Sequence, residues 1–382
     1  MPPAQGPAVP SAVPGLTLVP TAIDSIPGFE SDRLVEALPA LHLSCDRFLA
    51  LPESRTIGPG ALAGTVADWH PICEGFAALP AADEGAFRAF MSENLVAFRV
   101  VDGKEGAADK GLFTGYYESE LDGSLTPSGP ASVPLYSPPD DMVMADLGLF
   151  ESDLQGQKIS GRLADGRLVP YFSRAEIDDG ALAGRGLELL WIDDPVDAFF
   201  LHVQGSGRVR LPDGGSLRVG YAGSNGLPFY AIGRHMLDKG IISRDQASMQ
   251  GIRDWLRSHP AEGKAIMELN SRYIFFQPIE GPGPIGAQGV ALTPERSLAV
   301  DTAFIPLGIP VFLDTTWPGS DRPLQRLMVA QDTGAAIQGV VRGDFFWGTG
   351  DAALAYAGKM KQPGSYYLFL PRSVAARLRA GS

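Results

Sequence analysis

The chain has 382 residues, of which 45% are hydrophobic and 20% charged, a composition typical of a globular protein large enough for two domains. Its net charge of -13 and the lack of any run of Lys or Arg exclude a phosphate-binding face, so we expect no nucleic-acid partner. No apolar stretch approaches the roughly 18 residues that a membrane-spanning helix needs, so we expect no transmembrane segment.

The beginning of the chain does not look like a targeting signal. Residues 1–20 lack both a basic start and a continuous apolar region, so no signal segment is visible. Their Pro, Ala and Val content predicts a flexible tail, which we place at residues 1–25.

The next part of the chain is predicted to be helical. Apolar residues recur at helical spacing in 31–51 and 84–95. Cys45 and Cys73 lie in this part, and the sequence leaves open whether they are buried thiols or a disulfide. Neither HExxH, CxxC nor paired histidine spacing occurs, so we expect no metal site.

From Leu112 onward the pattern changes to short strands and turns. The 46 glycines and 32 prolines are spread along the chain, which favours a mainly β protein with accessory helices. The sequence also predicts a hairpin at 208–219, around the turn 212–215, and two helices at 228–239 and from Ser243 to His259. The predicted strands are 112–118, 187–191, 198–203, 273–276, 298–300, 311–313, 327–330 and 366–370.

This order of elements predicts two domains. We expect residues 26–118 and 266–382 to form one domain, made of the helical part and a barrel, and residues 119–265 to be an inserted second β-barrel domain. A ligand groove is expected between the two, because domain interfaces commonly form such sites.

Two carboxylates stand out in the segment 330–348. Asp332 and Asp344 lie twelve residues apart among glycines and aromatic residues, after the apolar run 327–330. An acid at the end of a buried strand is shielded from water on one side. This burial favours the neutral form of the carboxyl group, as a general acid requires. Trp347 could offer a flat wall for a sugar ring. The alternative is that Asp-Thr-Gly after a strand is only a turn.

Three further segments carry candidate binding residues. The run 114–118 places two tyrosines side by side, so one of them faces away from the core, either at a sheet edge or as a sugar-binding wall. The runs 204–207 and 221–226 place amide and hydroxyl groups on glycine-rich loops, which suit uncharged polyhydroxyl ligands. Ordinary turn chemistry is the alternative for both loops.

Taken in order, four segments resemble the membrane-bound lytic murein transglycosylase A family: 113–117, 202–207, 221–226 and 332–344. The resemblance implies a double-psi β-barrel domain with an inserted second β-barrel domain and a groove for peptidoglycan glycan strands. It implies cleavage of the MurNAc-GlcNAc β-1,4 bond, leaving 1,6-anhydro-MurNAc ends, without a cofactor. A periplasmic location is implied, with association to the outer membrane or cell wall left open, and a monomer is favoured.

The resemblance also implies roles for individual residues. Asp344 matches the single catalytic acid, and Asp332 and Asp301 match supporting acids. The implied substrate-binding residues are Thr114, Tyr116, Tyr117, Gln204, Ser206, Tyr221, Asn225, Gly334, Gly339 and Trp347.

The sequence departs from the family pattern at a few places. The usual glycine pair is Gly334-Ala335 here, and Gln338 stands where a basic residue is common, which removes any charge-assisted role at that position. The N-terminal lipid-attachment cysteine is absent from this chain, so membrane anchoring does not follow.

Two other classes of function remain as alternatives. An aspartic peptidase is suggested by Asp332-Thr333-Gly334, but such enzymes need two Asp-Thr/Ser-Gly acids that share a proton. The segments 301–303 and 314–316 lack the glycine, so only a homodimer could supply the pair. A non-catalytic glycan-binding protein is the second alternative, although a mere binder has no use for a protonated carboxyl group.

Overall fold

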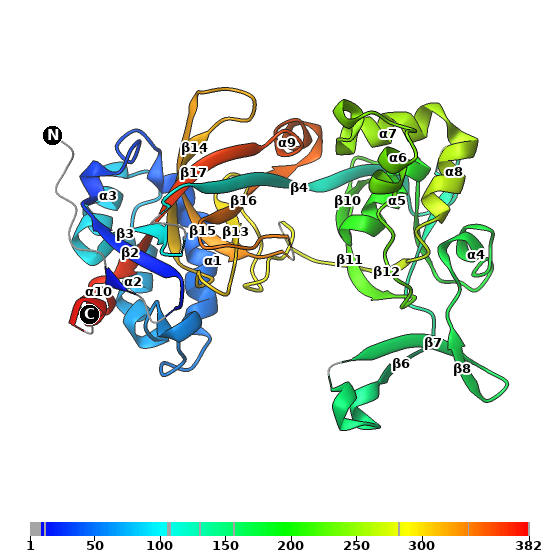
Figure 1. The fold of residues 1–382 in the computed structure, drawn as a ribbon, viewed down its shortest axis with the longest axis horizontal. Helices are drawn as coiled ribbons and strands as arrows, with labels where there is room; N and C mark the ends of the chain where they lie inside the picture. Colours follow the sequence, from blue (N-terminus) through cyan, green and yellow to red (C-terminus); the bar gives the residue numbers. More distant parts are fainter. Residues whose placement is uncertain are drawn as a thin grey trace. The chain divides into compact units, whose positions relative to one another are not determined.

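The computed structural model describes residues 9–10, 13–104, 108–129, 131–155, 157–281, 283–334 and 336–380. The chain divides into two compact units (Figure 1). The barrel unit comprises the residues up to Tyr117 and those from Gly281 onward, and the insert unit runs from Glu118 to Glu280. We expected the insert to end at residue 265, but it ends later because strand β12 (Ile274–Pro278) pairs with β11 (Ser216–Ser224) inside it.

Six strands of the barrel unit close into a ring. Their order is β17-β14-β15-β13-β16-β4, and β4 pairs back with β17. Strands β13 and β15 are parallel, whereas β14 runs antiparallel to both β15 and β17. The strands are β4 (Gly111–Ser124), β13 (Ser297–Val300), β14 (Pro310–Thr316), β15 (Pro323–Asp332), β16 (Arg342–Thr349) and β17 (Lys361–Pro371).

Three further strands extend this sheet from β17. Their order outward is β3 (Leu95–Asp102), β2 (Leu16–Thr21) and β1 (Val9–Pro10). Part of the expected flexible tail is therefore ordered, because every residue of β2 pairs with a residue of β3. Residues 1–8 and 11–12 of that tail lie outside the described residues.

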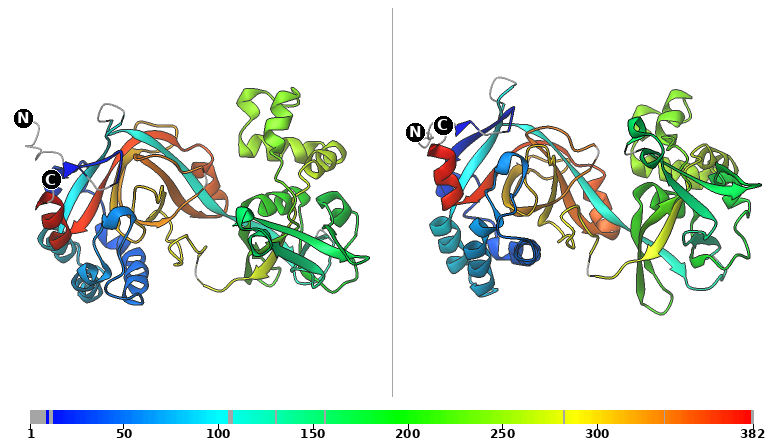
Figure 2. Two further views of the ribbon diagram at one scale, coloured as in Figure 1. Left: turned by 60° about the horizontal axis from the view of Figure 1, so that its bottom comes forward. Right: turned by 90° about the horizontal axis from the view of Figure 1, so that it is seen from below.

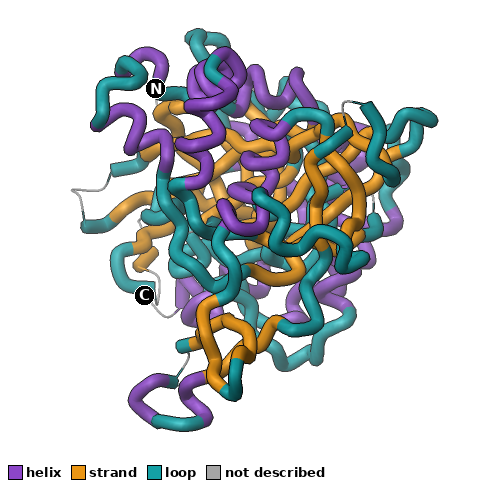
Figure 3. The backbone as a smooth tube through the Cα atoms, turned by 90° about the vertical axis from the view of Figure 1, so that its right-hand side faces the viewer, coloured by secondary structure: helices purple, strands orange, loops and turns teal. Residues whose placement is uncertain are grey.

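The helices of the barrel unit lie outside its strands (Figure 2), and Figure 3 distinguishes helices from strands along the backbone. They are α1 (Leu38–Leu49), α2 (Val66–Ala78), α3 (Glu84–Asn94), α9 (Gly350–Ala357) and α10 (Arg372–Ala380), with 3-10 turns at Ile23–Ser25, Leu34–Ala37 and Pro59–Ala61. Helix α2 starts at a capping box formed by Thr65 and Asp68. The predicted helices 31–51 and 84–95 are present as α1 and α3, although α1 begins only at Leu38.

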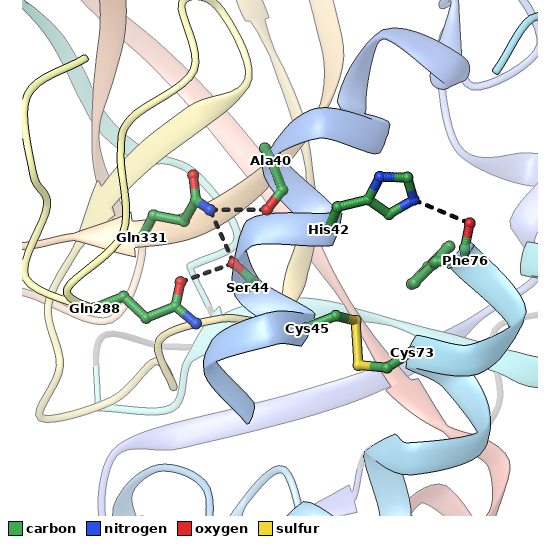
Figure 4. The surroundings of a disulfide bond; sticks show 8 residues. All are labelled: Ala40, His42, Ser44, Cys45, Cys73, Phe76, Gln288 and Gln331. Carbon is green, nitrogen blue, oxygen red and sulfur yellow. Dashed lines mark hydrogen bonds between the residues drawn. A yellow bond between two sulfur atoms is a disulfide. The ribbon is translucent and has the colours of Figure 1, made fainter. Parts of the chain in front are cut away.

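Cys45 and Cys73 form a disulfide bond that joins α1 to α2 (Figure 4). Both cysteines are buried, so the bond lies inside the core of the barrel unit. Of the two possibilities that the sequence left open, the structure therefore contains the cross-link.

The insert unit holds a sheet of six strands in the order β5-β9-β4-β10-β11-β12. A separate small sheet has the order β6-β7-β8. The strands not yet given are β5 (Val133–Tyr136), β6 (Met142–Asp146), β7 (Lys158–Ala164), β8 (Arg167–Pro170), β9 (Glu188–Ile192) and β10 (Ser206–Arg210). The helices are α4 (Arg174–Asp178), α5 (Pro195–Gln204), α6 (Ile232–Asp238), α7 (Met249–Ser258) and α8 (Pro260–Glu268), with 3-10 turns at Leu147–Leu149, Ser152–Leu154 and Arg244–Gln246.

One predicted strand of the insert is wrong. Residues 198–203 lie inside α5, whose start is capped by Asp194 and whose end is closed by Gly205 in the left-handed conformation. A short run of buried apolar residues has no period that distinguishes a strand from a buried helix. The predicted capping box at Ser243 exists, but it starts only the 3-10 turn, while Ser248 caps α7.

The disulfide should contribute strongly to the stability of the barrel unit. Replacing both Cys45 and Cys73 with Ser should lower the free energy of unfolding by about 3 kcal/mol, because a cross-link over 28 residues restricts the unfolded chain. Urea unfolding followed by circular dichroism measures the change. Wild-type protein treated with a thiol reductant should unfold at the same urea concentration as the double variant, and an unchanged midpoint in the variant would contradict this role.

Candidate active site

Strand β13 places two carboxylates at the same level of the barrel. Ala299 pairs with Asp332 on the parallel strand β15 and with Asp344 on the antiparallel strand β16. Since neighbouring strands lie about 4.8 Å apart, the two aspartates are separated by roughly 10 Å along the sheet. A register shift between Leu298 and Ala299 accompanies this arrangement. The candidate site is therefore built on rigid strands.

Asp344 is half-buried, and Thr114 is the residue that donates a hydrogen bond to it within the described part of the chain. Thr114 donates its hydroxyl hydrogen to Asp344 Oδ1 at 2.6 Å, and that hydroxyl accepts from Arg342 Nη2 at 2.8 Å. Burial raises the pKa of Asp344 above its usual value, and the charge of Asp332 raises it further. The Thr114 hydrogen bond and the Arg342 charge act in the opposite direction. The carboxyl group therefore keeps its proton to a higher pH than an ordinary aspartate.

Asp332, in contrast, is surrounded by donors. Tyr116 donates to Oδ2 at 2.9 Å, and the backbone amides of Ala287 and Thr333 each donate to Oδ1 at 2.9 Å. Burial raises the pKa of Tyr116 well above its usual range, and the neighbouring Asp332 adds to the shift. Three donors suit an ionised carboxylate, which can only accept. The two acids of the site thus have unequal surroundings.

Strand β4 supplies one contact to each acid. Thr114 and Tyr116 are two residues apart and so point to the same face of the strand, toward Asp344 and Asp332 respectively. Gly115 lies between them, on the opposite face. A Cβ atom there would stand 2.5 Å from Trp347 Nε1, so glycine is required for β4 to pack at this distance.

Asp301 holds the loop that leads into β16. Its Oδ1 accepts from the amide of Ala303 at 3.0 Å, and its Oδ2 accepts from the amide of Gly339 at 2.7 Å. Gly339 has a φ of 122°, in a region that favours glycine. Gly334 lies in an exposed turn and its carbonyl accepts from the amide of Ile337. Ala335 lies outside the described residues. Asp301 therefore fastens the loop.

Trp347 belongs to the core of the barrel unit. It is 5% exposed, and its ring lies within 5.2 Å of the rings of Phe345, Trp317 and Tyr356. The structure thus places it among core residues, where we had expected an open stacking wall. Tyr117 is half-buried and packs against the same core.

The remaining predicted residues lie in the insert unit. Asn225 is fully buried: its amide nitrogen donates to the carbonyls of Phe172 and Ser271, and its oxygen accepts from two backbone amides. Its position is therefore that of a structural residue. Gln204 accepts from the hydroxyl of Ser119, and Ser206 begins β10. Tyr221 is 52% exposed and can meet a ligand.

Sequence reasoning missed a buried hydrogen-bond network that adjoins Asp332 in the chain. Figure 4 shows its members Ser44, Gln288 and Gln331. Ser44 on α1 donates to Gln288 Oε1 at 2.7 Å and accepts from Gln331 Nε2 at 2.8 Å. The backbone amide of Gln288 donates to the backbone carbonyl of Gln331 at 3.0 Å. Gln288 follows Ala287 in the chain, and Gln331 precedes Asp332. Helix α1 therefore helps to position both partners of the hydrogen bond from the Ala287 backbone amide to Asp332 Oδ1. Backbone amides do not depend on residue type, and these glutamines belong to no recognisable motif, so the sequence contained no signal for the network.

Arg342 was also missed. Its Nη1 donates to the carbonyl of Leu112 at 3.2 Å and to that of Gly343, and it reaches Asp344 only through Thr114. The described residues contain no direct ion pair between Arg342 and Asp344. The sequence did contain one signal: Arg342 and Asp344 are two residues apart on β16, so their side chains lie on the same face of the strand.

Two negative findings concern only the part of the chain that the structure describes. Within it, no group of three or more His, Cys, Asp or Glu side chains is placed to hold a metal ion. None of its helices combines the length and apolar character that crossing a membrane requires.

Two protein families match parts of the sequence. The MltA specific insert domain matches residues 112–277, and the 3D domain matches residues 296–370. The membrane-bound lytic murein transglycosylase A of Vibrio cholerae is 34% identical over 201 residues, which cover 50% of this chain and 54% of that protein. The aligned part therefore spans about half the length of this curated relative.

Solved structures match the chain more fully. The crystal structure of MltA from Neisseria gonorrhoeae is 30% identical with a TM-score of 0.81, and the match covers 97% of this chain and 94% of that one. The crystal structure of Escherichia coli MltA with bound chitohexaose is 25% identical with a TM-score of 0.62, covering 89% and 91%.

The closed six-stranded barrel, the inserted unit and the half-buried acid on β16 define a two-domain double-psi β-barrel protein. The expected fold class, mainly β with accessory helices, is confirmed. The chain belongs to the membrane-bound lytic murein transglycosylase A family, as its resemblance predicts.

The contact between Thr114 and Asp344 gives a direct test of the site. Thr114→Val keeps the shape of the side chain but removes the hydroxyl group, whose hydrogen bond lowers the pKa of Asp344. The variant should therefore raise that pKa further, as measured by a carboxyl-carbon NMR titration. The matched control is Thr333→Val, since the Thr333 hydroxyl donates to the carbonyl of Val300. An unchanged or lowered Asp344 pKa in Thr114→Val would refute the assigned contact.

Proposed function

We propose that this protein is a lytic transglycosylase that cleaves the MurNAc-GlcNAc β-1,4 bond of peptidoglycan and leaves 1,6-anhydro-MurNAc ends. The observation that carries the proposal is Asp344, a half-buried carboxyl group whose pKa is raised by burial. Among the described residues it accepts one hydrogen bond, from Thr114, which leaves the carboxyl group available to a substrate. Family membership supports the reaction class.

In the proposed reaction Asp344 acts twice. Protonated Asp344 donates to the glycosidic oxygen as the bond to C1 breaks, and the GlcNAc-side alcohol leaves while C1 gains oxocarbenium character. The C6 hydroxyl of the same MurNAc then bonds to C1 and gives its proton to the Asp344 carboxylate. The acid is regenerated and no water is consumed.

An intramolecular nucleophile removes the need for a second catalytic carboxylate. Ordinary glycosidases place two carboxyl groups about 5 to 10 Å apart, one of them free to act as nucleophile or base. Asp332 is the nearby candidate, but its oxygens already accept from Tyr116 and two backbone amides. Its proposed part is electrostatic, because its charge raises the pKa of Asp344. Attack by C6–OH within one sugar ring has the advantage of proximity.

Peptidoglycan as the substrate and the cell envelope as the location belong to the same proposal. A family structure from Escherichia coli carries bound chitohexaose, an oligomer of N-acetylated sugars. The Cys45–Cys73 disulfide is a feature of proteins that fold in oxidising compartments, which supports a periplasmic site of action.

Removing the acid should abolish turnover. Asp344→Asn should release anhydro-muropeptides from murein sacculi at least about a hundredfold more slowly than wild type, since a general acid contributes that much or more. Asp332→Asn should retain a larger share of activity, because the residue does not transfer the proton. Mass spectrometry of the soluble products measures both.

The same experiment separates the alternatives. Reducing-end products in place of anhydro ends mean hydrolysis, and saturable binding to sacculi without soluble fragments means a glycan-binding protein. Inhibition by pepstatin would point to an aspartic peptidase. Circular dichroism of each variant shows whether it is folded, and wild-type turnover by Asp344→Asn would eliminate the assigned role.

The pH dependence supplies an independent check. Since Asp344 must be protonated, the rate should fall as pH rises through its raised pKa. Asp332→Asn removes a negative charge that raises this pKa, so the alkaline limb should move to lower pH. Asp314→Asn is the matched control, because Asp314 lies on β14 and accepts from Gln325. The pH of the alkaline limb should be unchanged in this control. If Asp332→Asn also keeps the wild-type alkaline limb, the electrostatic coupling is disproved.

A further inference from the structure

The insert unit contains a cavity to which the proposed reaction gives no role. Its volume is about 560 Å³, within the usual range for small-ligand sites. Apolar side chains from three elements form much of its wall, among them Val133 on β5, Val196 and Phe199 on α5, and Met267 on α8. All of its lining residues lie between 132 and 273, so the cavity belongs to this unit alone.

His202 brings a hydrogen-bond donor to this cavity. It is 6% exposed and lines the wall. Its Nδ1 accepts from the amide of Ile274 at 3.2 Å, and burial lowers the pKa of the ring well below its usual value, so the ring is neutral with its hydrogen on Nε2. Among the described residues no acceptor pairs with this Nε2–H, and the atom is not sealed from solvent, so a ligand that enters the cavity can accept from it.

Arg174 brings a second donor beside the first. Its guanidinium centre lies 5.1 Å from the ring of Tyr273, and the His202 ring lies 4.2 Å from the same ring. Nε and Nη2 of Arg174 donate to the carbonyls of Asn270 and Arg272. The remaining nitrogen, Nη1, lies 4.0 Å from Asp178 Oδ2, which is too long for a hydrogen bond. Arg174 itself is 3% exposed.

Asp178 lies in a long ion pair, 4.0 Å from Arg174 Nη1. Its side chain is 32% exposed and lines the cavity. No hydrogen bond from the described residues reaches its carboxylate, although the charged groups of Arg174, Asp179, Lys264 and Glu268 lie around it. Burial raises its pKa to about 6, so it is mostly ionised at pH 7.5. Two donors and one acceptor therefore meet in this cavity. Its other charged lining residues are engaged in ion pairs, Arg257 with Asp194 and Lys264 with Asp179 and Glu268.

We infer that this cavity binds a secondary amide that carries a small apolar group. The amide oxygen would accept from His202 Nε2, its N–H would donate to Asp178, and its apolar substituent would contact the wall. Arg174 Nη1, 4.0 Å from Asp178 Oδ2, supports the charged form of that carboxylate. A free carboxylate is opposed by Asp178 and a free ammonium by Arg174, because each meets a like charge. The acetamido group of an N-acetylated sugar and the peptide bond of a short peptide share this chemistry.

Amide recognition at this cavity does not depend on the proposed reaction. Only the idea that peptidoglycan supplies the amide rests on the proposed function, since that polymer contains both acetamido groups and peptide bonds. The test therefore uses isolated ligands and needs no turnover. Probe binding is compared between wild type and variants of Asp178, none of which alters the proposed active site, so a failure of the reaction and a failure of this site are distinguishable.

Binding of two uncharged probes to the full chain tests the inference. Triacetylchitotriose presents acetamido groups, and N-acetylalanine N-methylamide presents peptide bonds; isothermal titration at pH 7.5 measures each dissociation constant. Asp178→Leu removes the acceptor, keeps the number and branching of the side-chain heavy atoms, and should weaken binding of the probe at least about tenfold. Asp178→Asn keeps an acceptor oxygen and should stay within about threefold of wild type.

An exposed acid of the same unit provides the matched control. Asp238 pairs with Arg234 and does not line the cavity, so Asp238→Leu should bind as wild type does. The probe whose affinity falls in Asp178→Leu identifies the source of the amide. The inference is overturned if neither probe binds at millimolar concentration, if Asp178→Leu binds both as tightly as wild type, or if Asp238→Leu weakens binding equally. Thermal unfolding of each variant shows that it remains folded.

Discussion

The double pairing of Ala299 is the constraint on which the site depends. Because β13 lies between β15 and β16, one residue of this short strand sets the level of Asp332 on one side and Asp344 on the other. The two acids then differ through their surroundings alone. Asp332 is held by three donors, whereas Asp344 has one donor and is half-buried. Two like groups in unequal environments are a general way to obtain one acid and one stable anion.

Each acid is also supported from a different part of the fold. On the Asp332 side, the disulfide-linked helix α1 holds Gln288 and Gln331 through Ser44, and these residues adjoin the amide and the carboxylate that meet there. On the Asp344 side, the support comes from β4 and from Arg342 acting through Thr114. The site thus draws on the N-terminal helices as well as on the barrel, although those helices carry none of its reactive groups.

The sequence was most informative where several short segments occurred in order. It indicated the mainly β fold, the family and the two acids, and it selected Thr114 and Tyr116, which the structure brings to those acids. It failed where the role of a residue depends on the direction in which its side chain points. Composition cannot say that Trp347 and Asn225 point inward, nor that the apolar residues 198–203 form a helix. The partners of Asp332 escaped notice because backbone amides are the same in every sequence.

The alternation along β4 has a consequence for how this protein can vary over evolution. Thr114 and Tyr116 reach their acids because a single residue separates them, and Gly115 uses the other face to approach Trp347. Adding or deleting one residue here would exchange the two faces and turn the tyrosine or the threonine away from its acid, whatever the residue types. Sequence divergence within residues 114–116 should therefore occur by substitution, whereas insertions and deletions should accumulate in the surface loops.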